Sequence, residues 1–189
     1  MKNLFSLVAL VILVSAMAFA QPAATNGTSA IGTAVFLLEG GLDLEGTDGD
    51  WGVLSPGTVY TFMPNGIVTP PENSNGDGTY PAITYWTITS VIGAGIDVTF
   101  TLPSFFVGVD FGARIPYTVN SQSAGWFSEE PDVDLAYEPF DPRVPKRVYC
   151  NPDGETWVAI GGIVSVGTGL PVEDEYWATF ILTANWAGF

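Results

Sequence analysis

Alternation of apolar and polar positions is the main pattern along this chain of 189 residues. In residues 96–102, Val98, Phe100 and Leu102 face one way, and polar side chains occupy most positions between them. Residues 176–186 keep this spacing and carry apolar side chains on both faces. A period of two with many β-branched and aromatic residues is typical of β-strands. Apolar residues at helical spacing are nearly absent, so the pattern predicts an all-β protein.

Further strands are predicted where short apolar runs are bounded by Gly, Pro, Asn and Asp, at residues 29–38, 58–63, 83–92, 115–119 and 157–166. Gly161 and Gly162 interrupt the last of these runs, which predicts a bulge or bend there. The spacing favours one antiparallel Ig-like β-sandwich over residues 21–189. Residues 121–154 are rich in proline and charge and are predicted to form a long irregular loop excursion.

The first twenty residues have the three parts of a secretory signal peptide. Lys2 supplies the positive charge, residues 4–14 are almost all apolar, and Ala18 and Ala20 flank Phe19 as at a cleavage site. An uncleaved anchor helix is the alternative, although the apolar run is short for a membrane span. We therefore expect a secreted protein, extracellular or at the cell surface, without a membrane span once the signal is removed.

Charge and composition exclude several classes of function. The chain has 20 Asp and Glu against 5 Lys and Arg, a formal net charge of −15, and no histidine. Such a surface repels nucleic acid, whose binding needs basic residues. Histidine, which is the commonest general base and metal ligand, is missing from the chain. A hydrolase with two facing carboxylates is the remaining catalytic alternative, but the acidic residues lie mostly in turns, so we expect no enzyme.

Oxygen-rich segments suggest calcium, with ordinary turns as the alternative. Residues 73–78 place Asn73, Asn75 and Asp77 at alternate positions before a glycine, as in the first half of a calcium loop. The acidic ligand expected at the twelfth position is Thr84, which excludes an EF-hand. Residues 43–50 form a second oxygen-rich segment and are interpreted as a loop. Apart from weak calcium binding, no cofactor is predicted.

Tryptophan is abundant, with six in the chain, so an exposed aromatic row could stack on sugar rings. Trp86, Trp157 and Trp177 fall inside predicted strands, where core packing is the expectation. Trp51 and Trp126 lie closer to predicted loops and are the better candidates for contact with carbohydrate.

Four stretches, taken in order, resemble a family of secreted bacterial β-proteins known as domain of unknown function 4402. They are residues 50–57, the pair 86–89 and 97–103, residues 158–166, and residues 176–184. The chain departs from the family pattern at Trp51, at Glu175 and in its longer segment 121–154. Because the family resembles archaic chaperone–usher pilins and spore-coat-like domains, the resemblance implies an Ig-like sandwich, assembly into a fibre and a secretion chaperone as partner. It implies no catalytic residues.

Two segments are predicted to join copies of the chain by β-strand complementation. A strand that is apolar on both faces needs cover on both sides or a place in another sheet. The candidate residues are Ile31, Val35, Phe36, Leu37 and Leu38 in the first segment, and Tyr176, Phe180, Leu182 and Trp186 in the last. The first segment is either donated to a neighbour or paired within its own sheet.

Basic residues form a compact island at Arg143, Lys146 and Arg147, preceded by six acidic residues. The island either contacts the acidic surface of another copy or forms a local salt-bridged loop. Cys150 either cross-links subunits or stays a free thiol. Together these features predict a structural subunit of an extracellular fibre, pilus or surface layer that binds copies of itself. A cell-surface module that binds carbohydrate or calcium is the alternative.

Overall fold

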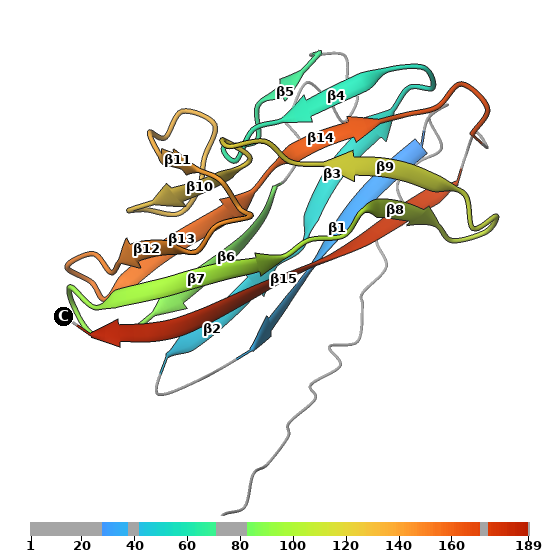
Figure 1. Cartoon of the computed structure of the whole chain (residues 1–189). Coiled ribbons are helices and arrows are strands. Elements are labelled where there is room, and N and C mark those ends of the chain that lie inside the picture. The colour runs from blue at the N-terminus through green and yellow to red at the C-terminus, as the bar shows by residue number, and fades with distance from the viewer. Residues whose placement is uncertain (1–27, 38–41, 71–82, 171–173, 189) are drawn as a thin grey trace, which may run out of the picture.

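The computed structural model describes residues 28–37, 42–70, 83–170 and 174–188, which form strands and no helix (Figure 1). The predicted signal peptide, residues 1–20, lies outside the described residues. The strands are β1 (Thr28–Leu37), β2 (Asp43–Thr47), β3 (Gly49–Leu54), β4 (Val59–Phe62), β5 (Val68–Thr69), β6 (Thr84–Thr89), β7 (Gly95–Thr101), β8 (Phe105–Gly108), β9 (Arg114–Thr118), β10 (Ala124–Phe127), β11 (Glu138–Phe140), β12 (Lys146–Tyr149), β13 (Glu155–Ile160), β14 (Gly162–Ser165) and β15 (Glu175–Gly188).

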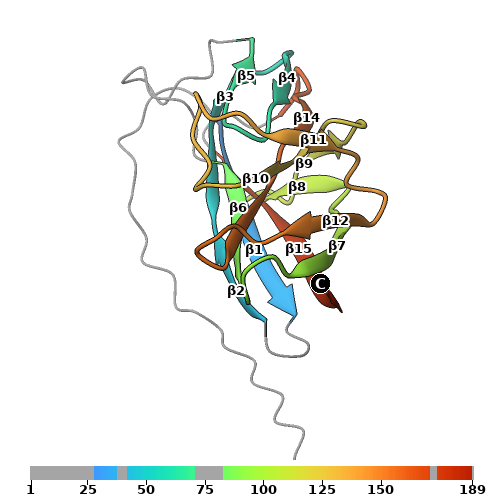
Figure 2. The same cartoon turned by 90° about the vertical axis from the view of Figure 1, so that its left-hand side faces the viewer.

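The strands form two packed sheets, which confirms the predicted β-sandwich (Figure 2). The larger sheet has ten strands, with β12, β7, β15, β8, β9, β14, β4 and β5 in order and β1 and β3 attached beside β15. The smaller sheet has the order β11, β10, β13, β6, β2. All of the pairings among the described strands are antiparallel except one, which joins β1 to β15.

One large apolar core lies between the sheets. Five aromatic rings from both ends of the sequence meet in it, and Trp51 is their centre: its ring stacks on Phe180 at 5.6 Å between centroids and lies 4.6 Å from Phe62, with Phe106 and Tyr117 beside them. All five rings are at most 4% exposed. Aromatic pairs at these separations add to the stabilisation that burial of their area supplies.

Residues 121–154 are more regular than predicted, because they contain β10, β11 and β12. The segment extends the smaller sheet through β10 and β11 and then crosses to the edge of the larger sheet through β12. On the way, Leu135 and Tyr137 pack on a second apolar cluster formed by Phe127, Trp157 and Ala159. The excursion therefore covers the outer face of the smaller sheet, since alternate residues of β13 point away from the main core.

The bend predicted at Gly161 and Gly162 is present, and there the chain passes from the smaller sheet to the larger one. A Cβ atom on Gly161 would lie 2.2 Å from the carbonyl oxygen of Phe62, and Gly162 has a φ of 150°. The crossing requires glycine at both positions: Gly161 lies too close to the β4 backbone for a side chain, and a Cβ atom on Gly162 would lie 2.4 Å from the Tyr117 ring.

Candidate assembly site

The first of the described strands, β1, lies inside the larger sheet. β1 runs parallel to β15, with Ser29 opposite Glu175 and Leu37 opposite Thr183, and its other edge pairs antiparallel with β3. This arrangement is the alternative in which residues 31–37 pair within their own sheet. Among the described strands, β3 has no other partner in a sheet, so β1 alone joins β3 to the rest of the larger sheet.

The last strand has no free edge over most of its length. β1 occupies one edge of β15 from Glu175 to Thr183, while β8 and β7 share the other edge. In this arrangement the backbone groups with which β15 would add to the sheet of a neighbour are mostly hydrogen-bonded within the chain, and assembly through β15 stays a prediction. Its predicted assembly residues Tyr176, Phe180 and Leu182 lie in the core, whereas Trp186 is 39% exposed.

The basic island consists of residues that are each paired within the chain. The Arg143 guanidinium contacts Asp141 at 2.7 Å, Lys146 contacts Glu138, and Arg147 contacts Asp97 at 2.8 Å. The partner of Arg147 lies on β7, fifty residues away in sequence, and ties β12 to that strand. These contacts favour the local salt-bridged loop over an unpaired basic patch.

The ion pairs of Arg143 and Arg147 lower the pKa values of their acids. The Arg143 side chain and backbone N–H donate hydrogen bonds to Asp141 and lower the pKa of this carboxyl to about 2. The hydrogen bonds from Arg147 lower the pKa of Asp97 despite a small opposing effect of burial. Because these groups are exposed, the pairs contribute little to stability.

Cys150 is a free thiol that is only 6% exposed and belongs to the main core. Burial raises the pKa of this thiol, so the reactive thiolate is disfavoured. The geometry favours the free thiol over a cross-link between subunits.

The calcium prediction gains no site from the described part of the chain. Asn73, Asn75 and Asp77 lie outside the described residues, as does Leu38 of the first assembly segment. Within the described ranges, no three acidic or cysteine side chains gather closely enough to hold a metal ion. The oxygen-rich segment 43–50 was interpreted wrongly as a loop: it forms β2 and the start of β3.

The aromatic side chains proposed for sugar contact differ in exposure. Trp51 is buried at the centre of the core, so it is not available to a ligand. Trp126 is half-buried; its indole Nε1 donates a hydrogen bond to Thr156 at 2.7 Å, and Lys146 lies over its ring. Trp86 and Trp157 are core residues, as predicted.

A polar contact beneath the β8–β9 hairpin was not anticipated. The buried carboxylate of Asp174 accepts a hydrogen bond from the backbone N–H of Asp110 at 3.1 Å and thereby holds the turn between β8 and β9. Gly108 makes this approach feasible, because a Cβ atom there would lie 2.1 Å from Asp174 Oδ2. The lone glycine at the end of residues 105–108 was the only sequence signal for this contact.

The described structure thus defines an all-β sandwich whose N-terminal strand completes its larger sheet. None of the described residues belongs to a helix with the length and hydropathy of a membrane span. Comparison of the chain with known protein families, with curated proteins and with solved structures finds no significant match. The resemblance to domain of unknown function 4402 therefore stays a prediction.

Proposed function

We propose that this protein is a secreted structural subunit of an extracellular fibre, pilus or surface layer, in which β1 of one copy completes the larger sheet of the next. The observation that carries this proposal is the position of β1, which is the first of the described strands in sequence and is internal in the sheet, between β3 and β15.

Departure of β1 would leave a slot with unpaired backbone donors and acceptors on both sides. One wall of the slot is β15 and the other is β3, which has no further partner among the described strands. Two facing strand edges with unpaired backbone groups bind an added strand through main-chain hydrogen bonds. Because no described strand precedes β1, it can leave its slot or enter another without threading the described part of the chain through a loop.

The same slot accepts the β1 strand of another copy in the same register, which is the rule for swapped elements. Leu37 ends β1 opposite Thr183, and β2 begins six residues later at Asp43. Six residues reach about 20 Å at most. A donor must therefore bring the end that carries the β1–β2 connection close to the same end of the acceptor, so neighbouring copies lie side by side.

A pair of engineered cysteines tests the exchange. Thr33 and Thr179 are directly opposite in the β1–β15 register, so Thr33→Cys and Thr179→Cys, with Cys150→Ala to remove the native thiol, place one cysteine on each strand. Oxidation of assembled protein is expected to give a covalent ladder on a denaturing gel without reductant. A monomer band alone from assembled material would contradict strand exchange.

The matched control is Thr99→Cys with Thr183→Cys in the same background. These threonines are opposite on β7 and β15, which stay in one chain whether or not β1 is exchanged. This pair is expected to give only the monomer band. Electron microscopy of the unmodified protein supplies the accompanying observation: regular assemblies support the proposal, and dispersed particles at high concentration count against it.

A further inference from the structure

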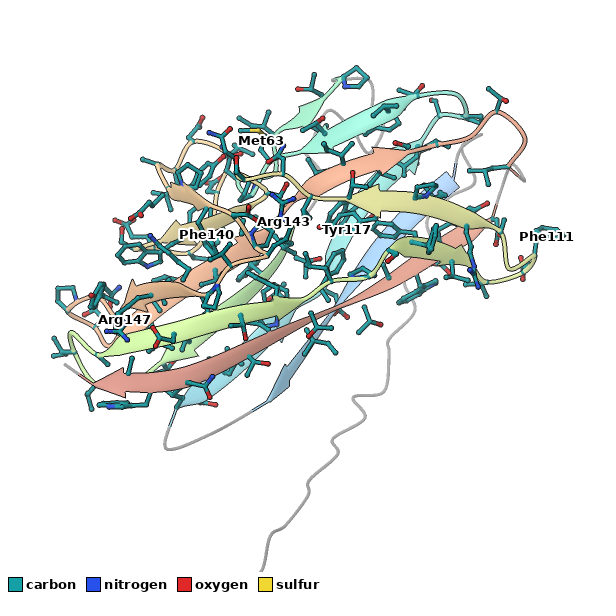
Figure 3. All side chains as sticks on the ribbon, in the orientation of Figure 1. Met63, Phe111, Tyr117, Phe140, Arg143 and Arg147 are labelled. Carbon is teal, nitrogen blue, oxygen red and sulfur yellow. The ribbon has the colours of Figure 1, made fainter. Side chains whose placement is uncertain are left out.

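Exposed apolar side chains gather at two places that are far apart on the molecule. Of eleven large apolar side chains that are exposed in the described structure, eight fall in two groups. We call them the hairpin end, made of Phe105, Val107, Val109 and Phe111, and the terminal end, made of Val91, Ile92, Tyr149 and Trp186. Figure 3 shows Phe111 at one extremity and Arg147, two residues before Tyr149, near the other.

The hairpin end is a continuous surface of β8, β9 and the turn between them. Alternation in β8 buries Phe106 and Gly108 and turns Phe105 and Val107 outward. The turn then exposes Val109 and Phe111, which at 61% and 68% are among the most exposed apolar residues of the chain. Since isolated exposed side chains are ordinary but contiguous apolar patches mark interaction surfaces, this grouping indicates a binding site.

A cation accompanies the hairpin end. The guanidinium of Arg114 lies over the Phe105 ring, 5.4 Å from its centroid. Among the bases in the described ranges, Arg114 is the one with no carboxylate at ion-pair distance, while the other three are all paired within the chain. On a chain with 20 acidic residues, an unpaired arginine in an apolar patch favours a partner that is apolar and acidic.

The terminal end has that chemistry. Two turns, residues 90–93 and 150–154, meet there through backbone hydrogen bonds: the Gly93 N–H donates to the carbonyl oxygen of Cys150 at 3.3 Å, and the Ser90 N–H donates to that of Gly154 at 2.8 Å. The turn at residues 90–93, which carries Val91 and Ile92, therefore lies next to the turn at residues 150–154, which carries the exposed carboxylate of Asp153. Asp153 makes no ion pair with a described base.

We infer that the hairpin end of one copy docks on the terminal end of the next, with Phe111 and Val109 against Val91 and Ile92 and Arg114 facing the Asp153 turn. The two surfaces are different and lie at opposite ends, so the contact is heterologous and builds an open chain of copies. This inference rests on the proposed role as an assembly subunit, but it needs no strand exchange, because β1 stays in its own sheet.

The test therefore starts from protein in which the Thr33→Cys and Thr179→Cys bridge holds β1 in its own chain. Sedimentation velocity over a concentration series is expected to show linear multimers of this locked monomer. Val109→Asp with Phe111→Asp is expected to weaken association by about tenfold or more, because it places charge in the centre of the contact. Val144→Asp is the matched control, since Val144 is 56% exposed on a different part of the chain, and it is expected to leave association unchanged.

A mixing experiment tests the head-to-tail geometry. Ile92→Asp spoils the terminal end and Phe111→Asp spoils the hairpin end, so each variant keeps one working surface. Each is expected to be monomeric alone, and an equimolar mixture is expected to form dimers and nothing larger. Locked protein that stays monomeric, a hairpin variant that associates like its parent, or Ile92→Asp protein that dimerises with itself would overturn the inference. Failure of the cysteine ladder with persistence of these multimers would refute strand exchange alone.

Discussion

Substitution of Gly108 by alanine tests how the hairpin end is held. The added Cβ atom would lie 2.1 Å from Asp174 Oδ2 and 3.0 Å from its Cγ, both far inside contact distance. Asp174 is 2% exposed and has a short side chain, so its carboxylate cannot simply swing into solvent. It must instead move away from Asp110, whose backbone N–H it now accepts at 3.1 Å.

Two effects of Gly108→Ala set the expected loss in the free energy of unfolding: overpacking by the new Cβ atom and loss of the hydrogen bond between Asp110 and Asp174. Overpacking of a filled site costs about 1–3 kcal/mol, and a hydrogen bond to a charged group contributes about 1.5–3 kcal/mol. Gly108→Ala should therefore lower the free energy of unfolding by about 3 kcal/mol. Asp174→Ala should cost only about 1 kcal/mol, because it loses the same hydrogen bond but also removes Oδ2, a buried oxygen without a hydrogen-bond partner.

The double variant, Gly108→Ala with Asp174→Ala, distinguishes a clash with Asp174 from any other destabilising effect of alanine in β8. If the damage passes through Asp174, the double variant should cost little more than Asp174→Ala alone, with a coupling of about 2 kcal/mol. The residual cost comes from the Tyr176 ring, whose Cε1 would lie 3.2 Å from the new Cβ atom. Urea unfolding followed by tryptophan fluorescence measures all four proteins, and additive costs would refute the explanation.

Three further outcomes are expected. Trp51→Ala should lower the free energy of unfolding by about 3–5 kcal/mol, because its ring packs on four others; a loss below about 1.5 kcal/mol in urea would contradict this central role. Arg143→Gln should raise the pKa of Asp141 from about 2 towards its ordinary 3.8 in an NMR titration, while the bond from the backbone N–H of residue 143 keeps part of the shift; an unchanged pKa would contradict the pair. Burial raises the pKa of Tyr117, so the folded state holds this proton more tightly than the unfolded chain, and stability should be complete below about pH 10 and fall above it. Tyr117→Phe should show a smaller alkaline loss of the urea midpoint, and an equal loss would assign the effect to other groups.

Local alternation was sufficient to predict the strands that carry it. β7 and β15 were placed to within a residue or two, since one apolar and one polar face can be recognised without any partner. β2 and β3 were missed because Asp43, Asp48 and Asp50 with nearby glycines have turn chemistry. Their strand character depends on what they pair with, β6 for one and β1 for the other. Tertiary context thus outweighed local propensity.

Less of the candidate assembly site than of the fold could be predicted from the sequence. The apolar content of residues 31–38 showed a strand, but its place between β3 and β15 depends on pairing with β15, since Ser29 lies opposite Glu175, far later in the sequence. The partner of Arg147 lies 50 residues away in sequence, so a basic cluster in sequence became three separate ion pairs in space. The exposed side chains of the hairpin end look ordinary in sequence, because alternation shows which residues share a face but not which face is covered.

The two proposed contacts act in different directions, and this difference decides the kind of assembly. Exchange of β1 in its present register aligns the same ends of neighbouring copies, since the β1–β2 connection spans at most about 20 Å. Docking of the hairpin end on the terminal end extends the assembly along the long direction of the molecule (Figure 3). Each contact alone gives a one-dimensional array, but together they give a two-dimensional one. Of the proposed roles, the surface layer therefore requires both contacts, whereas a fibre requires one. Variants that lose one contact should convert sheets into filaments, and electron microscopy distinguishes these forms directly.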